Sequence, residues 1–143
     1  MLGRKDYTQE ELDHARSAIG AQTAKYEELV RAIGAGSPDP KVTSALDAFE
    51  PLFFNNMALA LDRLFVHRLR TVTGKDTNPL NELELICESL MNNEGVLRGN
   101  NVVKYVPEEA VVKLNIGDRI RLTAGQFADL AAGVLAEIER KFR

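Results

Sequence analysis

Residues 8–33 read TQEELDHARSAIGAQTAKYEELVRAI, and this stretch decides the fold class. Thr8 and Glu11 match a capping box, in which a hydroxyl and a carboxylate three residues apart bind the free backbone N–H groups at a helix start. Apolar residues then recur at every seventh position, at Leu12, Ile19, Tyr26 and Ile33. The spacing predicts a helix of about 25 residues with a single apolar face.

A second helix is predicted over 40–73. Asp39 supplies an N-cap and Pro40 occupies the first helical position, where proline is well tolerated. Apolar residues continue on one face as far as Phe65. Pro51 removes one backbone hydrogen bond in the middle of the segment, which predicts a kink there.

Two more helices follow the same rules. The helix predicted over 79–93 opens on an Asn-Pro pair and stops before Gly95, because glycine readily adopts the conformation that ends a helix. The last helix, over 124–142, follows a second capping box formed by Thr123 and Gln126. Both segments carry apolar residues at spacings of three and four.

Before the last helix the apolar period changes from 3.6 to two. Alternating apolar residues stand at Val112, Leu114, Ile116, Ile120 and Leu122. A three-residue turn at 117–119 keeps them on one face, so the pattern predicts an antiparallel β-hairpin over about 111–122. The predicted fold is therefore mainly α: a four-helix bundle-like single domain over 1–143, with a small hairpin inserted before the last helix.

The composition and charge of the chain limit the classes of function that we expect. The chain has 143 residues, 45% of them hydrophobic and 27% charged, as in an ordinary single-domain globular protein. A net charge of −3 gives no general attraction to nucleic acid or anionic membranes. The single cysteine excludes an intrachain disulfide and suits the cytoplasm. The segment 1–14 lacks the apolar region of a secretory signal, and no apolar run approaches the roughly 20 residues of a membrane span.

The sequence gives little support for metal binding, cofactor binding or catalysis by a thiol. Glu11 and His14 have the Glu-x-x-His spacing of di-iron helical bundles, but such a site needs two of these pairs, and His67 is the only other histidine. The chain has no glycine-rich phosphate-binding motif. Cys87 stands on an apolar stripe, as a small core residue does. We therefore expect no metal, no cofactor and no catalytic residue.

One polar group remains of interest. Arg63, His67 and Arg70 are four and three residues apart, a spacing that places them along one face of the predicted 40–73 helix. The arginines could neutralise a phosphodiester while the histidine moves a proton, which would suit RNA binding or metal-independent RNA cleavage. Alternatively, the face is solvated or ion-paired. The acidic residues that could pair with it are Asp62, Glu82 and Glu84.

Residues 87–96 read CESLMNNEGV, and their layout resembles a motif of a known protein family. From about residue 78 to 142, the chain resembles the C-terminal part of HEPN-type helical proteins. In many of these, a helix ends in arginine-asparagine, three residues, and a histidine followed by asparagine and glycine. A variable loop or hairpin and an amphipathic helix come next. The resemblance implies an α-helical dimer. Active members are metal-independent RNases, and others are non-catalytic partners in larger assemblies.

The catalytic positions of that motif are degenerate here. When the motif is aligned on Asn93 and Gly95, Asn92 stands at the histidine position, Cys87 at the arginine position and Glu88 at the neighbouring asparagine position. Asparagine cannot transfer a proton, and Cys87 offers no positive charge for a phosphate. The resemblance therefore implies a non-catalytic HEPN-like scaffold, a homodimer that binds a protein or nucleic-acid partner.

Two alternatives stay open beside this leading hypothesis. The first is an RNA-binding protein or RNase that uses the Arg63, His67 and Arg70 face. The second is a regulator that contacts its partner through the basic hairpin. The outward-facing cations of that hairpin are Lys113, Arg119 and Arg121. The sequence favours a protein without enzymatic activity.

Overall fold

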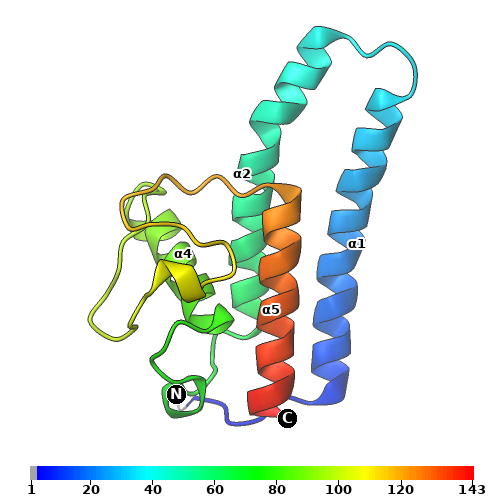
Figure 1. The fold of residues 1–143 in the computed structure, drawn as a ribbon. Helices are drawn as coiled ribbons and strands as arrows, with labels where there is room; N and C mark the ends of the chain where they lie inside the picture. Colours follow the sequence, from blue (N-terminus) through cyan, green and yellow to red (C-terminus); the bar gives the residue numbers. More distant parts are fainter. Residues whose placement is uncertain (1–2) are drawn as a thin grey trace.

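The computed structural model describes residues 3–143. Its helices are α1 (Gln9–Gly34), α2 (Pro40–Leu64), α3 (Arg70–Thr73), α4 (Pro79–Asn92) and α5 (Ala124–Phe142), with a 3-10 turn η1 (Pro107–Glu109). Helices α2, α4 and α5 pack against one another, and α1 lies along α2 and α5 (Figure 1). The prediction of a mainly α fold is confirmed. None of the helices described is long and apolar enough to cross a membrane.

The predicted helix starts are confirmed. Thr8 accepts a hydrogen bond from the backbone N–H of Glu11, and the Glu11 carboxylate accepts one from the backbone of Thr8. Thr123 and Gln126 form the same reciprocal pair at the start of α5. Because these short-range caps depend only on neighbouring residues, they can be read directly from the sequence.

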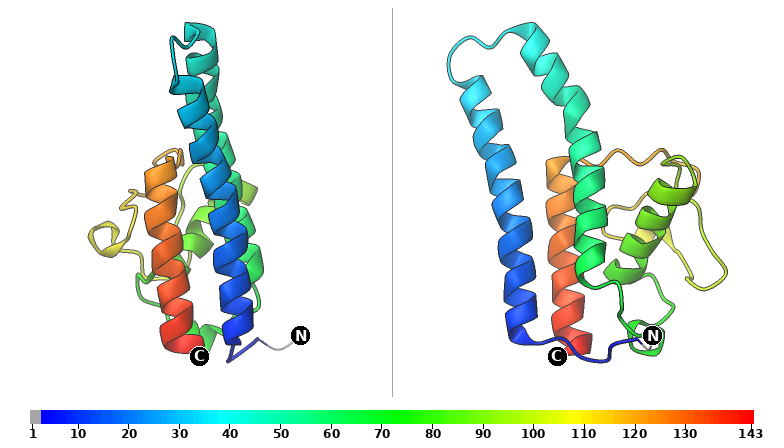
Figure 2. Two further views of the ribbon diagram at one scale, coloured as in Figure 1. Left: turned by 90° about the vertical axis from the view of Figure 1, so that its right-hand side faces the viewer. Right: turned by 180° about the vertical axis from the view of Figure 1, so that it is seen from behind.

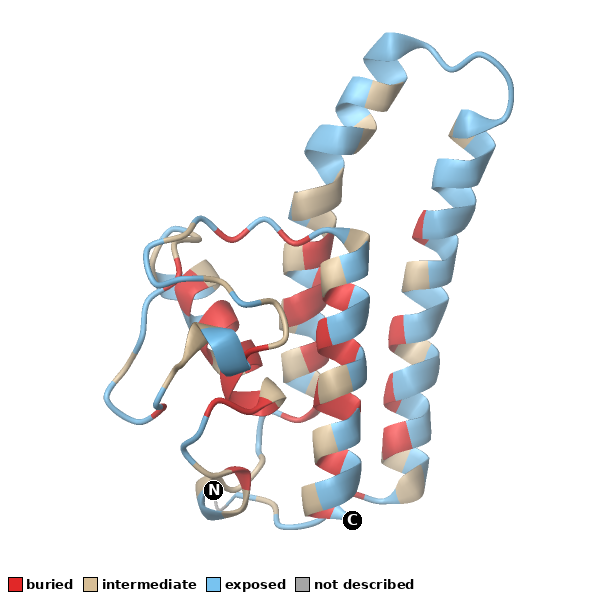
Figure 3. Ribbon diagram, in the orientation of Figure 1, coloured by how far each residue is buried: buried red, intermediate tan, exposed pale blue. Residues whose placement is uncertain are grey.

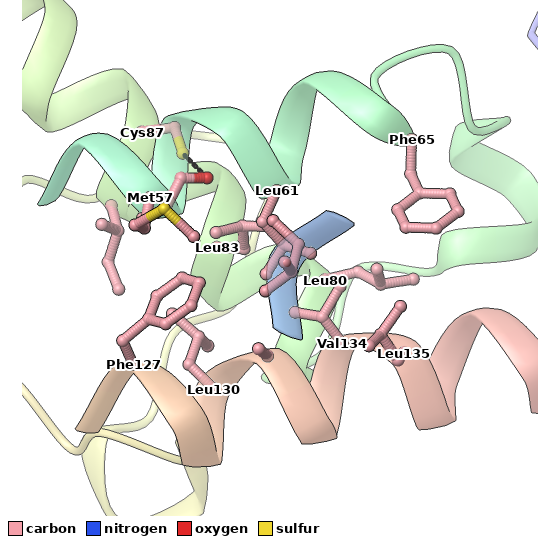
Figure 4. Packing of buried hydrophobic residues seen from close by; sticks show 14 of the residues in the cluster. Met57, Leu61, Phe65, Leu80, Leu83, Cys87, Phe127, Leu130, Val134 and Leu135 are labelled. Carbon is pink, nitrogen blue, oxygen red and sulfur yellow. Dashed lines mark hydrogen bonds between the residues drawn. The ribbon is translucent and has the colours of Figure 1, made fainter. Parts of the chain in front are cut away.

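The core lies where α2, α4 and α5 meet. Met57 and Leu61 of α2 face Leu83 of α4, and Phe127 and Leu130 of α5 close the layer (Figure 4). All five side chains are buried. Burial of such side chains is the dominant favourable term in folding, at roughly 1.5–3 kcal/mol for each large apolar residue. The apolar stripes of these three helices thus cover one another.

The predicted 40–73 helix is divided. Helix α2 runs unbroken through Pro51 but ends at Leu64, and a turn over 65–67 leads to the short α3. The N-terminal segment explains the break. The backbone N–H of Arg4 donates to the His67 carbonyl at 2.6 Å, and the Arg4 carbonyl accepts from Leu69 at 2.8 Å. These bonds hold Arg68 and Leu69 extended beside Arg4, so the helix cannot continue.

The predicted β-hairpin is wrong. Within residues 3–143 no strand is formed, and 111–122 is irregular, with Lys113 in the left-handed region at φ +63°. Instead of pairing with itself, the segment makes one isolated antiparallel bridge, between Val96 and Arg119. The hypothesis that a basic hairpin contacts a partner therefore lacks the hairpin on which it depended.

Side chains from the helices explain why no hairpin forms. The Glu82 carboxylate accepts hydrogen bonds from the backbone N–H groups of Val111 and Val112, at 2.7 and 2.8 Å. The Asn55 amide donates to the Ile120 carbonyl at 2.9 Å and accepts from the Leu122 N–H at 3.1 Å. Because these four backbone groups are already bonded to helix side chains, they are not available for a β-ladder.

Replacing Asn55 with alanine tests this attachment. The change removes both hydrogen bonds to the loop, so we expect a loss of about 2 kcal/mol in the free energy of unfolding, measured by urea denaturation. The neighbouring Asn56 is exposed, and Asn56→Ala serves as the matched control with an expected change within about 0.5 kcal/mol. Equal losses in the two variants would contradict the anchoring role.

The outer parts of α1 and α2 extend beyond the end of α5 (Figures 1 and 2). We call residues 21–53 the arm. They comprise these helix parts, the loop joining them and the turns of α1 and α2 that lie beside the start of α5. Most arm residues are exposed, in contrast to the buried centre of the bundle (Figure 3). The fold therefore has a packed base and a projecting two-helix arm.

Candidate functional site: a groove between α2 and α4

A groove of about 450 Å³ lies between the C-terminal half of α2 and helix α4. We call it the α2–α4 groove. Its lining residues are Leu59, Asp62, Arg63, Val66, Arg68, Glu84, Cys87, Glu88, Met91 and Asn92. It brings one residue of the predicted cationic face, Arg63, together with three residues of the degenerate motif, Cys87, Glu88 and Asn92. One residue of the first prediction thus lies beside three residues of the second.

The other two members of the cationic face lie elsewhere. Because α2 ends at Leu64, His67 falls in the following turn, and Arg70 begins α3. The His67 side chain is exposed and does not line the groove. The helical alignment of Arg63, His67 and Arg70 is therefore not formed.

Arg70 is held by ion-pairing. Its guanidinium pairs with the Glu84 carboxylate, and it donates to the Asn81 side-chain oxygen at 2.6 Å and to the Gly74 carbonyl at 3.0 Å. These bonds attach the loop after α3 to helix α4. The ion-paired interpretation holds for this residue, whose charge is already compensated.

Arg68 is compensated in the same way inside the groove. Its side chain is only 6% exposed and donates to the Asp62 carboxylate at 3.1 Å and to the Phe65 carbonyl at 2.9 Å. Burial raises the pKa of Asp62, and the positive charge of Arg68 opposes that rise. Because Asp62 compensates its charge, Arg68 is not a free cation in the groove.

Arg63 and Glu88 carry the groove's uncompensated charge. Among the residues that the structure describes, Arg63 has no hydrogen-bond or ion-pair partner, and Glu88 accepts a single side-chain hydrogen bond, from Asn100 at 3.2 Å. They stand on opposite walls, Arg63 on α2 and Glu88 on α4. Exposed apolar side chains flank them, Met91 at 68% exposure and Val66 at 41%.

The degenerate motif serves the helix end. Cys87 is buried, its thiol donates to the Ala58 carbonyl at 3.5 Å, and burial raises its pKa, so it remains a protonated thiol (Figure 4). The Asn93 side chain donates to the Val96 carbonyl at 2.6 Å. Gly95, at φ +77°, donates its N–H to the Ser89 carbonyl. Asn92 and Glu88 are exposed and line the groove, so their side chains remain free for contact with a partner.

The Glu-x-x-His pair has a structural use. The Arg4 guanidinium donates to both Glu11 oxygens, at 2.7 and 2.9 Å, and with the cap bond it lowers the pKa of Glu11 to about 2. His14 is exposed. Across residues 3–143 no group of three or more histidine, cysteine, aspartate or glutamate side chains could hold a metal ion.

Sequence reasoning named Asp62 as a possible ion-pair partner but missed its pairing with Arg68 and the apolar groove residues. Asp62 and Arg68 form their buried pair only because the chain turns at 65–67, which no local pattern predicted. Met91 and Val66 gave a weak signal, since each is a large apolar residue outside the predicted core stripe.

Comparison with known proteins adds no further guide: no family model, no curated protein and no solved structure matches the chain. The HEPN-type resemblance therefore stays a prediction. The function is argued below from the contacts and charges of the groove.

Proposed function

We propose that this chain is a non-catalytic, HEPN-like helical scaffold that acts in the cytoplasm by binding, and that two copies pair through the α2–α4 groove. The observation that carries the proposal is the pattern of charge in the groove. One uncompensated cation and one nearly free anion stand on opposite walls beside exposed apolar side chains. The one cysteine is free and buried, which suits a reducing compartment.

Such a surface is complementary to itself. A twofold axis places the same patch on both sides of an interface, so that residue i meets residue j and j meets i. About an axis through the groove, Arg63 of one copy faces Glu88 of the other, and the reverse pair forms at the same time. Met91 and Val66 then lose water contact at the centre, where an interface gains most of its energy.

The contacts argue against an RNase. Its two essential elements would be a free cation for the phosphate and a group that transfers protons. Arg63 offers a free cation, but Arg68 and Arg70 are already paired with carboxylates. The histidine that would transfer the proton, His67, lies outside the groove. The groove lining also holds three acidic residues against two arginines, a balance that repels a phosphate backbone.

Charge reversal tests the pairing. We expect Arg63→Glu and Glu88→Arg each to self-associate at least about tenfold more weakly than the wild-type chain, because like charges then meet across the axis. The double variant, Arg63→Glu with Glu88→Arg, restores the opposite-charge contacts and should restore association. The dissociation constant and particle mass are measured by sedimentation equilibrium at tens of micromolar.

Matched controls separate this effect from net charge. Arg121 and Glu109 are exposed and lie away from the groove, so Arg121→Glu and Glu109→Arg should leave the mass unchanged. A wild-type chain that stays monomeric would contradict the proposal. So would a double variant that associates no better than the single ones.

A further inference from the structure

A second cleft lies at the base of the arm, where α1 and α2 meet the start of α5 (Figure 1). We call it the arm cleft. Its volume is about 370 Å³, near the lower end of the roughly 300–1,000 Å³ of small-ligand pockets. Its lining residues are Tyr26, Glu27, Val30, Arg31, Leu46, Asp47, Glu50 and Ala124. None of them lines the α2–α4 groove, so the two sites are separate.

Carboxylates dominate the walls of the arm cleft. Glu27 stands on α1, and Asp47 and Glu50 stand on α2, against the single guanidinium of Arg31. Within residues 3–143, neither Glu27 nor Asp47 makes an ion pair or a side-chain hydrogen bond, and both are exposed. Glu50 Oε2 accepts from the Ala124 backbone N–H at 2.9 Å, and its other oxygen has no partner in the same described range. The cleft therefore carries an excess of uncompensated negative charge.

A buried tyrosine opens into the same cleft. Tyr26 is only 7% exposed, and its ring stacks on Phe53 and packs edge-on against Phe54. Its hydroxyl makes no hydrogen bond within the described chain, yet the oxygen is not cut off from solvent. Burial raises the pKa of Tyr26, and the nearby carboxylates of Glu50 and Asp47 raise it further. A side chain more than nine-tenths buried whose hydroxyl lacks a partner is uncommon, and here it points to a ligand.

We propose that the arm cleft binds the guanidinium group of an arginine side chain in an extended segment of a partner protein. A guanidinium stays charged and carries five N–H donors in one plane, so it can donate to carboxylates on both helices at once. The Tyr26 hydroxyl accepts a further hydrogen bond. Val30 and Leu46 pack against the methylene stem of the arginine, as apolar surface does beside long cationic side chains.

The separation of the carboxylates favours an organic cation over a metal ion. Metal ions need several oxygen ligands within about 2.0–2.6 Å. In residues 3–143, no group of three or more acidic, histidine or cysteine side chains could hold one. A planar fork of donors can span acceptors that do not converge, and an ammonium, which is a compact point charge, reaches fewer of them.

Arg31 favours a peptide over a free small cation. It is exposed at the cleft and has no ion-pair or hydrogen-bond partner within the described residues. Its charge repels a ligand that carries several cations, such as a polyamine. Its N–H groups can instead donate to a backbone carbonyl beside the bound arginine. A partner segment with a single arginine therefore satisfies both signs of charge in the cleft.

A titration with a short peptide tests this inference. The probe is acetyl-Gly-Arg-Gly-amide, added to the isotope-labelled full chain at low salt and followed by NMR. We expect saturable shifts of the amide signals of Glu27, Asp47 and Glu50, with a dissociation constant on the order of 1 mM. The matching citrulline peptide, which has the same shape without the charge, should bind at least about tenfold more weakly. The lysine peptide and propylguanidinium should each bind at least about threefold more weakly.

Substitutions in the cleft give the second part of the test. Asp47→Asn and Glu27→Gln each remove one charge at an exposed site, and each should weaken binding at least about threefold. Tyr26→Phe should weaken binding roughly two- to threefold and leave the unfolding midpoint unchanged, since its hydroxyl makes no hydrogen bond within the described chain. Asp129→Asn, at an exposed site on α5 outside the cleft, is the matched control for net charge.

The outcomes that would overturn the inference are specific. They are the absence of saturable shifts at the cleft, citrulline or lysine peptides that bind as tightly as the arginine peptide, and an Asp129→Asn effect as large as that of Asp47→Asn. Propylguanidinium that binds as tightly as the peptide would overturn the assignment to a partner protein.

The arm cleft does not depend on pairing through the α2–α4 groove. The Arg63→Glu chain should bind the arginine peptide as the wild type does, because every lining residue belongs to one copy. A chain that is monomeric yet binds the peptide contradicts the pairing and supports the cleft. A chain that pairs but shows no shift at the cleft does the reverse.

Discussion

Replacing Glu82 with alanine is expected to lower the free energy of unfolding by about 3–5 kcal/mol, since two hydrogen bonds to a buried carboxylate are lost. Glu82 is 2% exposed and holds the backbone N–H groups of Val111 and Val112, which have no other partner in the described chain. The variant leaves these donors beside an apolar cavity. Thermal and urea unfolding, followed by circular dichroism, measure the loss.

The same variant should also change the pH dependence of stability. Burial raises the pKa of Glu82 above its ordinary value of 4.5, and the backbone donors oppose that rise. The folded state therefore binds this proton more tightly than the unfolded state. The contribution of Glu82 to the wild-type free energy of unfolding is fully present below about pH 4.5. It is lost as the pH rises through the pKa of Glu82 in the folded state. The loss caused by Glu82→Ala should accordingly be greatest at acid pH.

Glu109→Ala is the matched control for Glu82→Ala. Glu109 is exposed on the 3-10 turn just before the segment that Glu82 holds, so its replacement should change stability by no more than about 0.5 kcal/mol. If Glu82→Ala were equally mild, the carboxylate would not be what anchors the 111–122 segment.

Replacing Arg68 with methionine is expected to cost about 3–5 kcal/mol at neutral pH. Methionine has a similar length but leaves the Asp62 carboxylate, already two-thirds or more buried, without its cation. The expected pH trend is opposite to that of Glu82→Ala. Without Arg68 the folded pKa of Asp62 rises further, so the variant regains stability as acid neutralises the carboxylate.

Two companion variants make the Arg68 result interpretable. Adding Asp62→Asn to Arg68→Met removes the uncompensated charge, and we expect it to recover about half of the lost stability at neutral pH. Arg121→Met changes an exposed arginine away from the groove and should be nearly neutral. If Asp62→Asn gave no recovery, the cost would come from lost packing and carbonyl contacts rather than from charge.

Much of the helical framework could be predicted from local sequence. The caps at Thr8, Asn78 and Thr123 and the apolar stripes behind them placed α1, α4 and α5 within about two residues of their observed ends. These signals are reliable because the cap and the stripe involve residues that are neighbours along the chain. Helix α2 began where Pro40 predicted, but its end did not.

The errors share one cause. The 111–122 segment alternates as a hairpin should, yet Glu82 and Asn55 bind its backbone from helices that are distant in the sequence. The 40–73 helix has a continuous apolar face, yet Arg4 pairs with the backbone at 67–69 and ends it. In each case a long-range hydrogen bond replaced the local pairing that the pattern predicted.

The sequence by itself determined the mainly α class and three of the four long helices. Only the tertiary structure decided which charged side chains are paired and which are not. It separated His67 from Arg63, paired Arg70 with Glu84 and Arg68 with Asp62, and left Arg63 and Glu88 on the two walls of a groove without an ion-pair partner among the described residues. The physical reason is that a cap acts between neighbours, whereas a charge is compensated by whatever the fold brings near it.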